Sequence, residues 1–197
     1  MNCVVKTYLQ DLIEILQCID IQVIYDIIGI LEKCHNDGAV LYIMGNGGSA
    51  ATASHMANDF SVGLKLRDIR NFNVQSLSDN TPVCSAIAND IGYENVFYAQ
   101  LKHKLKPQDV VIAISCSGNS ENIIKASRYA KEVGASLIGM TGFDGGELKA
   151  LSDVNFHIKT DQGEYGLVED AHMILDHVIY NYYVSQKIEN KSTYVLK

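Results

Sequence analysis

Five short apolar stretches recur along the chain, each separated from the next by a longer segment of helical character. They cover residues 39–44, 71–77, 110–114, 136–141 and 154–158. Short β-rich runs of this kind are typical of strands that are buried on both faces of a parallel sheet. Strands that alternate with helices predict an α/β fold, in which helices flank a doubly wound, five-stranded parallel sheet.

The remaining segments carry the pattern of helices. The predicted helices cover residues 50–60, 78–86, 92–105, 121–134 and 165–187. Residues 1–36 form a long N-terminal helical segment of one or two helices, which is apolar on more than one face. Such a helix is usually buried, so we expect it to pack against a partner subunit. No linker divides residues 1–197, which suits a single domain, and the polar residues 188–197 are expected to form a mobile tail.

Composition excludes several classes of function. A net charge of −7 argues against a protein that coats nucleic acid. No apolar stretch is long enough to span a membrane, and the N-terminus lacks the features of a signal peptide. The five cysteines are spread along the chain without a CxxC pair, which favours reduced thiols. We therefore expect a cytoplasmic protein without nucleic acid or membrane as a partner.

A glycine-rich loop, GNGGS, follows the first strand at residues 45–49. Its glycines let the backbone turn tightly and expose N–H groups, and the next helix adds the positive end of its dipole, so the loop favours a phosphate. Ser49 can cap that helix. The loop is not a P-loop, because Ala50 follows Ser49. The positions of Gly45, Gly47 and Ala50 also fit a dinucleotide site, but no acidic residue ends a second strand about 20 residues on.

A second loop of small polar residues, SCSGNS, follows the third strand at residues 115–120. Its hydroxyl groups can donate hydrogen bonds to a phosphate, although helix capping and turn formation also favour serine there. Since ligands of such folds gather where strands end, the two loops predict one phosphorylated substrate held between them. Cys116 is either a thiol activated by a helix N-terminus or a small residue that fills space.

Together with TGFDGGELKAL at residues 141–151, these loops resemble the sugar isomerase (SIS) domain family, and within it the phosphoheptose (sedoheptulose-7-phosphate) isomerases. The resemblance covers nearly the whole chain. It implies an enzyme that converts sedoheptulose 7-phosphate to an aldose heptose 7-phosphate through an enediol, for the heptose of a surface glycan. It also implies a homotetramer with active sites between subunits and a bound zinc ion.

The resemblance assigns roles to individual positions. The positions that match substrate-binding residues are Asn46, Gly47, Gly48, Ser49, Asn89, Asp90, Ser115, Cys116, Ser117 and Ser120. His55 matches a metal ligand, and His177 matches a ligand that is also the general acid/base. Two positions depart from the family pattern: Asp59 stands where the family has a glutamate that is base and ligand, and Glu169 stands where it has glutamine.

A zinc set of His55, Asp59, Glu169 and His177 is therefore predicted. His55 and Asp59 are four residues apart on one helical face, so both can reach one ion. Glu169 and His177 are separated by about 12 Å of helix, so they meet at one ion only if their long side chains converge or if the helix starts near Glu169. The catalytic base is Asp59 or Glu169, with His177 as its partner.

Other polar residues of the last helix have alternative interpretations. His172 is a rival ligand or a buried, hydrogen-bonded histidine. Asp170 and Asp176 are interpreted as a capping residue and a solvated charge, or as carboxylates that orient a histidine. The shorter Asp59 also motivates a second hypothesis for the whole chain: a non-catalytic SIS-fold protein that binds a phosphosugar or acts as an adaptor of the bacterial replication initiator.

Overall fold

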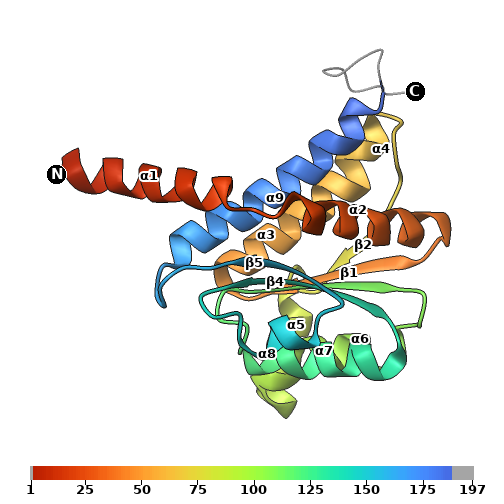
Figure 1. Cartoon of the computed structure of the whole chain (residues 1–197). Coiled ribbons are helices and arrows are strands. Elements are labelled where there is room, and N and C mark those ends of the chain that lie inside the picture. The colour runs from red at the N-terminus through yellow and green to blue at the C-terminus, as the bar shows by residue number, and fades with distance from the viewer. Residues whose placement is uncertain (1, 188–197) are drawn as a thin grey trace.

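The structure is a computed structural model that describes residues 2–187 (Figure 1). A parallel sheet of five strands lies at its centre, in the order β2-β1-β3-β4-β5. The strands are β1 (Val40–Gly45), β2 (Asn73–Ser76), β3 (Val110–Ser115), β4 (Ser136–Gly142) and β5 (Val154–Ile158). This confirms the predicted fold class, and each predicted strand is present. The predicted tail at residues 188–197 lies outside the described residues.

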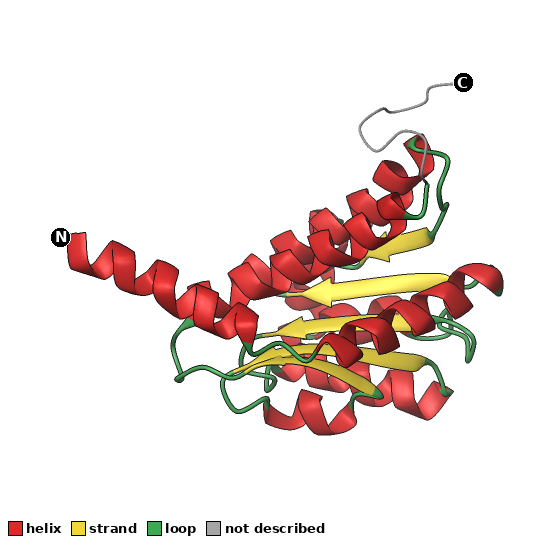
Figure 2. Cartoon of the chain, turned by 45° about the horizontal axis from the view of Figure 1, so that its top comes forward, coloured by secondary structure: helices red, strands yellow, loops and turns green. Residues whose placement is uncertain are grey.

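Helices cover both faces of the sheet, because the side chains of each strand alternate between two cores (Figures 1 and 2). Leu41 and Ile43 face the first core, and Tyr42 and Met44 face the second. The first face carries α2 (Ile21–Asn36), α3 (Gly47–Asn58) and α9 (Tyr165–Ser185). The second carries α5 (Thr81–Ile91), α6 (Val96–Leu101), α7 (Glu121–Val133) and α8 (Gly146–Leu151).

The strand order fixes where a ligand can bind. From β1 the chain moves to one edge of the sheet to form β2, and it then crosses to the other side of β1 to form β3. The connections after β1 and β3 therefore leave the sheet on opposite faces, and a crevice opens between them at the carboxyl ends of the strands. Both predicted phosphate loops lie at this point.

The N-terminal segment forms two helices, α1 (Asn2–Gln17) and α2. The break comes where Asp20 caps α2, its side chain accepting a hydrogen bond from the amide of Gln22 at 2.9 Å. Helix α1 extends away from the sheet (Figure 2). Tyr8 connects it to α9 by a 2.7 Å hydrogen bond to Asp170. Much of the apolar surface of α1 is consequently exposed within one chain.

Two local details differ from the prediction. Helix α3 begins at Gly47 with Asn46 as its N-cap residue, so Ser49 is buried within the first turn and does not cap it. At its other end α3 runs on through a π-helical turn, Asp59–Gly63, into α4 (Leu64–Leu66). None of the helices within residues 2–187 has the length and apolar character needed to span a membrane.

Candidate active site

A cavity of about 160 Å³ lies at the crevice between the loops that follow β1 and β3. Its lining residues are Asn46, Ser49, Ile114, Ser115, Cys116, Ser117, Ser120, Tyr165 and Glu169. The fold thus brings most of the predicted substrate-binding residues of both loops to one cavity, called the serine cavity below. The start of α9 closes it with Tyr165 and Glu169.

The hydroxyl groups of the serine cavity are held by the loop itself. The Oγ atoms of Ser115 and Ser120 lie 3.2 Å apart, so one donates to the other and one hydroxyl proton remains for a ligand. Ser117 accepts a hydrogen bond from the amide of Asn119 at 3.2 Å, which leaves its own proton free to donate. The loop can turn this tightly because Gly118 has a φ of +63° and faces the backbone carbonyl of Gly145.

A pair of amides fixes the other wall of the serine cavity. Asn46 and Asn122 exchange two hydrogen bonds of 2.9 Å, and Tyr93 donates a third, of 2.8 Å, to the same oxygen of Asn46. The sequence interpretation missed Asn122 and Tyr93, although Asn122 follows the serine loop by only two residues. By contrast, Asn89 and Asp90 are exposed on α5 and do not line the serine cavity within the described part of the chain.

Glu169 lies against the first turn of α3. A Cβ atom added to Gly48 would come within 2.2 Å of Oε1 of Glu169, so the half-buried carboxylate sits directly over the backbone there. The positive end of the α3 dipole favours a carboxylate at this place. Burial, followed by the charge of Glu169, raises the pKa of the Cys116 thiol. The burial of Cys116 and its raised pKa favour the interpretation of this residue as one that fills space over that of an activated thiol.

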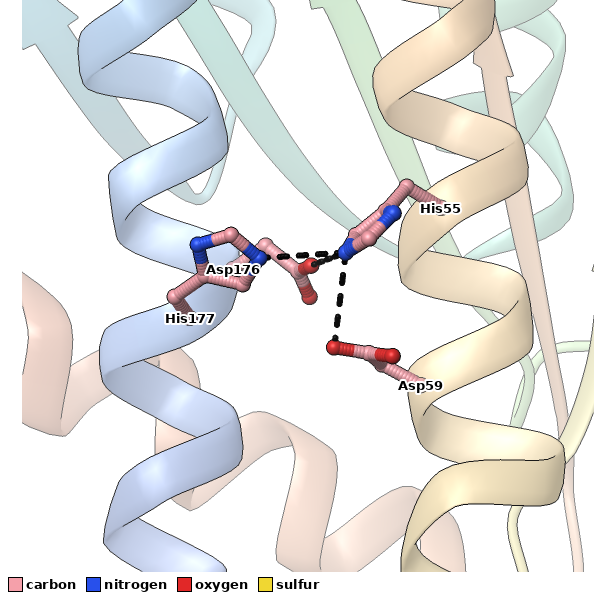
Figure 3. A group of neighbouring side chains, drawn as sticks. All are labelled: His55, Asp59, Asp176 and His177. Carbon is pink, nitrogen blue, oxygen red and sulfur yellow. Dashed lines mark hydrogen bonds and ion pairs between the residues drawn. The ribbon is translucent and has the colours of Figure 1, made fainter.

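Further along the same two helices, four side chains point toward one another (Figure 3). His55 and Asp59 come from α3 and its continuation, and Asp176 and His177 come from α9; one ligand atom from each lies within 4.8 Å of the others. We call this set the His/Asp group. The Nε2 atom of His55 is 3.1 Å from Nε2 of His177, 3.6 Å from Oδ2 of Asp59 and 3.7 Å from Oδ2 of Asp176.

These separations suit a metal ion. Ligands placed 2.0–2.2 Å from a tetrahedral ion are about 3.3–3.6 Å apart, which is close to the distances measured from His55. Nitrogen from two histidines and oxygen from two carboxylates is a donor set that first-row divalent ions accept. The structure thus brings together three of the four predicted ligands, His55, Asp59 and His177, as a possible metal-binding group.

Glu169, the fourth predicted ligand, is not in the His/Asp group. It lies seven residues before Asp176 on α9, and its carboxylate contacts Gly48, which lies seven residues before His55 on α3. Seven residues of helix span about 10 Å, so Glu169 and the group are two turns apart on both helices. Glu169 therefore lies outside the His/Asp group among the described residues, and its role as a ligand together with His177 stays a prediction.

Asp176 occupies the remaining place in the group, which corrects its interpretation as a solvated charge. Its side chain is fully buried, and no described residue donates a hydrogen bond to either oxygen. Burial and the nearby charge of Asp59 raise the pKa of Asp176 to about 8. His172, the rival ligand, is a buried histidine with Nε2 3.4 Å from the carbonyl oxygen of Thr141, and burial lowers its pKa to about 4.

Comparison with known proteins decides the family. The family model for the SIS domain matches residues 7–142, well over half of the chain. The chain belongs to the SIS domain family. Among curated relatives, a phosphoheptose isomerase of Helicobacter pylori (strain P12) is 38% identical over 150 residues, which cover 76% of each chain. One of Aquifex aeolicus (strain VF5) is 34% identical over 158 residues, which cover 80% of this chain and 81% of the relative.

A solved structure agrees with this assignment. The phosphoheptose isomerase of Neisseria gonorrhoeae superposes with a TM-score of 0.83 and 28% sequence identity, over 92% of this SIS-domain chain and 97% of that protein. Within the family, the chain is therefore placed with the phosphoheptose isomerases. The predicted family and fold are confirmed.

Proposed function

We propose that this SIS-domain protein interconverts sedoheptulose 7-phosphate and an aldose heptose 7-phosphate. The strongest support is the spacing of its two polar sites. The serine cavity and the His/Asp group lie on the same pair of helices, about 10 Å apart. An extended seven-carbon sugar phosphate is comparable in length, so a phosphate bound by the serines leaves the carbonyl end of the sugar where α3 and α9 meet, between Glu169 and the His/Asp group.

The phosphate is bound by hydroxyl groups and backbone amides. Ser115, Ser117 and Ser120 donate hydrogen bonds, and the first turn of α3 adds N–H groups and the helix dipole. Gly47, with a φ of +53°, turns the loop into that helix. No lysine or arginine is among the residues that line the serine cavity, so hydroxyl groups, amides and the helix dipole stabilise the negative charge of the phosphate. Asn89 and Asp90 remain proposed substrate contacts, made when subunits assemble.

Proton transfer needs a base beside carbon 1 of the ketose and an acid near the carbonyl oxygen. We assign the base to Glu169, whose carboxylate is held in the serine cavity. It takes the proton from carbon 1 to give an enediol and returns that proton to carbon 2. His177 moves the second proton from the hydroxyl oxygen on carbon 1 to the oxygen on carbon 2. A zinc ion bound by the His/Asp group would polarise the carbonyl and stabilise the enediolate.

The same proposal includes a homotetramer in the cytoplasm that supplies heptose for a surface glycan. Exposed apolar side chains, Val4, Val5, Leu9 and Ile13, run along α1. A mostly apolar hollow of about 590 Å³ lies where α2 meets α9, and it is lined in part by Val178, the neighbour of His177. Contiguous apolar surface of this kind is typical of protein–protein contacts. Light scattering of Leu9→Asp, with the exposed polar change Gln10→Asp as control, should show dissociation of the oligomer only in Leu9→Asp.

The reaction is tested by NMR with sedoheptulose 7-phosphate in deuterated water, with and without zinc. We expect deuterium in the sugar and the signals of the aldose. Ser120→Ala should raise KM more than it lowers kcat, whereas Ser185→Ala, at the far end of α9, should change neither. A folded protein that binds the sugar without exchange or product would contradict the proposal and favour the non-catalytic binding or adaptor function.

A further inference from the structure

We propose that Tyr93 and Asn122 are positioning residues, which fix the side-chain amide of Asn46 as a hydrogen-bond donor to the bound phosphosugar. This inference rests on the proposed function and deepens it, because it names a device that selects a phosphate group in the serine cavity. Asn46 lines that cavity, and both positioning residues act through their hydrogen bonds to it. An asparagine amide can offer a ligand its oxygen or its nitrogen, so its orientation decides which ligands it accepts.

The orientation of the Asn122 amide is the first step. Its oxygen, Oδ1, accepts a 2.9 Å hydrogen bond from the backbone amide of Ile123, in the first turn of α7. A backbone N–H can only donate, so the atom that faces Ile123 must be the oxygen of Asn122 and not its nitrogen. Asn122 is only 2% exposed, so turning its amide over would bury this N–H group without an acceptor. The Asn122 amide is therefore held in one orientation.

The orientation of Asn46 follows from that of Asn122. Nδ2 of Asn46 donates to Oδ1 of Asn122, and Nδ2 of Asn122 donates to Oδ1 of Asn46, both at 2.9 Å. The hydroxyl group of Tyr93 donates a further hydrogen bond of 2.8 Å to the same oxygen of Asn46. A carbonyl oxygen has two lone pairs, so both acceptor positions of Asn46 are occupied. One N–H of Nδ2 remains, and Asn46 therefore offers a ligand a donor and no acceptor.

A fixed donor suits a ligand group that only accepts hydrogen bonds. A phosphate dianion is such a group, and the hydroxyl groups of Ser115, Ser117 and Ser120 in the same cavity donate to it as well. An amide that was free to turn could face the anion with its oxygen, and the repulsion would weaken binding. The bonds from Tyr93 and Asn122 remove that orientation before the ligand arrives, so less side-chain freedom is lost on binding.

The first measurement is the Kd of the purified protein for inorganic phosphate, by isothermal titration calorimetry. Tyr93 is 57% exposed, so Tyr93→Phe removes one hydroxyl group without disturbing the core. It should weaken phosphate binding about 5-fold, the factor that corresponds to one net hydrogen bond. With sedoheptulose 7-phosphate it should raise KM by a similar factor and leave kcat unchanged, because the phosphate is held alike in ground state and transition state. Tyr98→Phe, on α6, is the matched control and should bind phosphate as the unaltered protein does.

A double-mutant cycle shows whether the two residues act through Asn46. When Tyr93→Phe is added to Asn46→Ala, phosphate binding should weaken no further. Asn122→Asp keeps an acceptor for Ile123 but cannot donate to Asn46, so it should weaken phosphate binding more in the unaltered protein than in Asn46→Ala. NMR of protein labelled with ¹⁵N-asparagine gives a second readout. Phosphate should move one of the two Nδ2 proton signals of Asn46 downfield, and this shift should disappear in Asn122→Asp.

Two results would overturn the inference. One is an unchanged phosphate affinity in Tyr93→Phe, and the other is a full further loss when Tyr93→Phe is added to Asn46→Ala. Neither measurement depends on turnover. If phosphate binding responds as expected but sedoheptulose 7-phosphate is not isomerised, the proposed function fails and the positioning role stands. If the sugar is isomerised with a KM that is indifferent to Tyr93→Phe and Asn122→Asp, the positioning role alone fails.

Discussion

The contact between Gly48 and Glu169 allows the proposed base to be displaced without being removed. In Gly48→Ala the new Cβ would lie 2.2 Å from Oε1 and 2.4 Å from Oε2 of Glu169. Ordinary van der Waals contact begins near 3.4 Å, so the carboxylate must retreat by roughly 1 Å. A shift of that size in a reacting group costs about 100-fold in rate, or about 2.7 kcal/mol of transition-state stabilisation.

The cost to folding should be far smaller. The clashing atoms form the end of a flexible side chain, and alanine is more favourable than glycine within a helix by about 0.8–1 kcal/mol. We therefore expect the free energy of unfolding, measured in urea, to change by less than about 1 kcal/mol while kcat falls about 100-fold. Gly29→Ala is the matched control. It lies on the exposed side of α2, and no described atom lies within 4 Å of its added Cβ, so turnover should be unaffected.

A double-mutant cycle tests whether the loss acts through Glu169. Deuterium exchange into the sugar is measured for Gly48→Ala, Glu169→Gln and the double variant. If the alanine acts by displacing the carboxylate, the double variant is no slower than Glu169→Gln alone. Additive losses would show that Gly48 contributes through its contact with the substrate instead. Turnover of Gly48→Ala within about 3-fold of the unaltered protein would refute the assignment of Glu169 as base.

Three further predictions concern stability and reactivity. Gly118→Ala should lower the free energy of unfolding, measured in urea, by more than about 2 kcal/mol. The φ of Gly118 is +63°, and the added Cβ would lie 1.9 Å from the rigid carbonyl oxygen of Gly145. A loss of less than about 1 kcal/mol would contradict this prediction. The pKa of His172 in the folded protein, about 4, lies below the ordinary value near 6.5. Between these two pH values the unfolded chain therefore binds a proton that the native state does not. We expect the free energy of unfolding to fall by up to about 3 kcal/mol as the pH falls from 6.5 to 4. Urea unfolding at several pH values checks this, and His172→Gln should flatten the dependence, whereas an unchanged slope would refute it. Because burial raises the pKa of Cys116, iodoacetamide at pH 8 should alkylate this thiol at least about 10-fold more slowly than the exposed Cys3. Mass spectrometry of tryptic peptides measures both rates, and equal rates would contradict the prediction.

The strands and the two phosphate loops could be predicted from the sequence, because their signals are local. The apolar residues 110–114 predict a strand that is buried on both faces, without any knowledge of the elements that pack against it. The serines that follow these residues must then lie at the end of that strand. The convergence of both loops on one cavity then follows from the topology. The pairing of His55 with Asp59 was predictable for the same reason, since four residues of helix fix it.

The place of Asp176 in the His/Asp group was not predictable in this way. Asp176 adjoins His177, and its only local signal is a charged residue beside Leu175 in an apolar stretch. Whether it meets solvent or the His/Asp group depends on how α9 packs against α3, which no short pattern encodes. The π-helical turn that begins at Asp59 depends on tertiary packing as well. Turns of this kind are rare and occur frequently at functional sites.

The pairing of α3 with α9 also has a consequence for how the protein is made. Gly48 meets Glu169 and His55 meets Asp176 across more than a hundred residues of intervening chain. Contacts so distant in sequence form late, and the chain leaves the ribosome from its N-terminus. During synthesis the residues of the sheet and of α3 are therefore made before those of α9, whose docking covers part of the first core. Until that final helix docks, the nascent chain lacks Glu169 and two of the four members of the His/Asp group, so this group and a closed core form in one step.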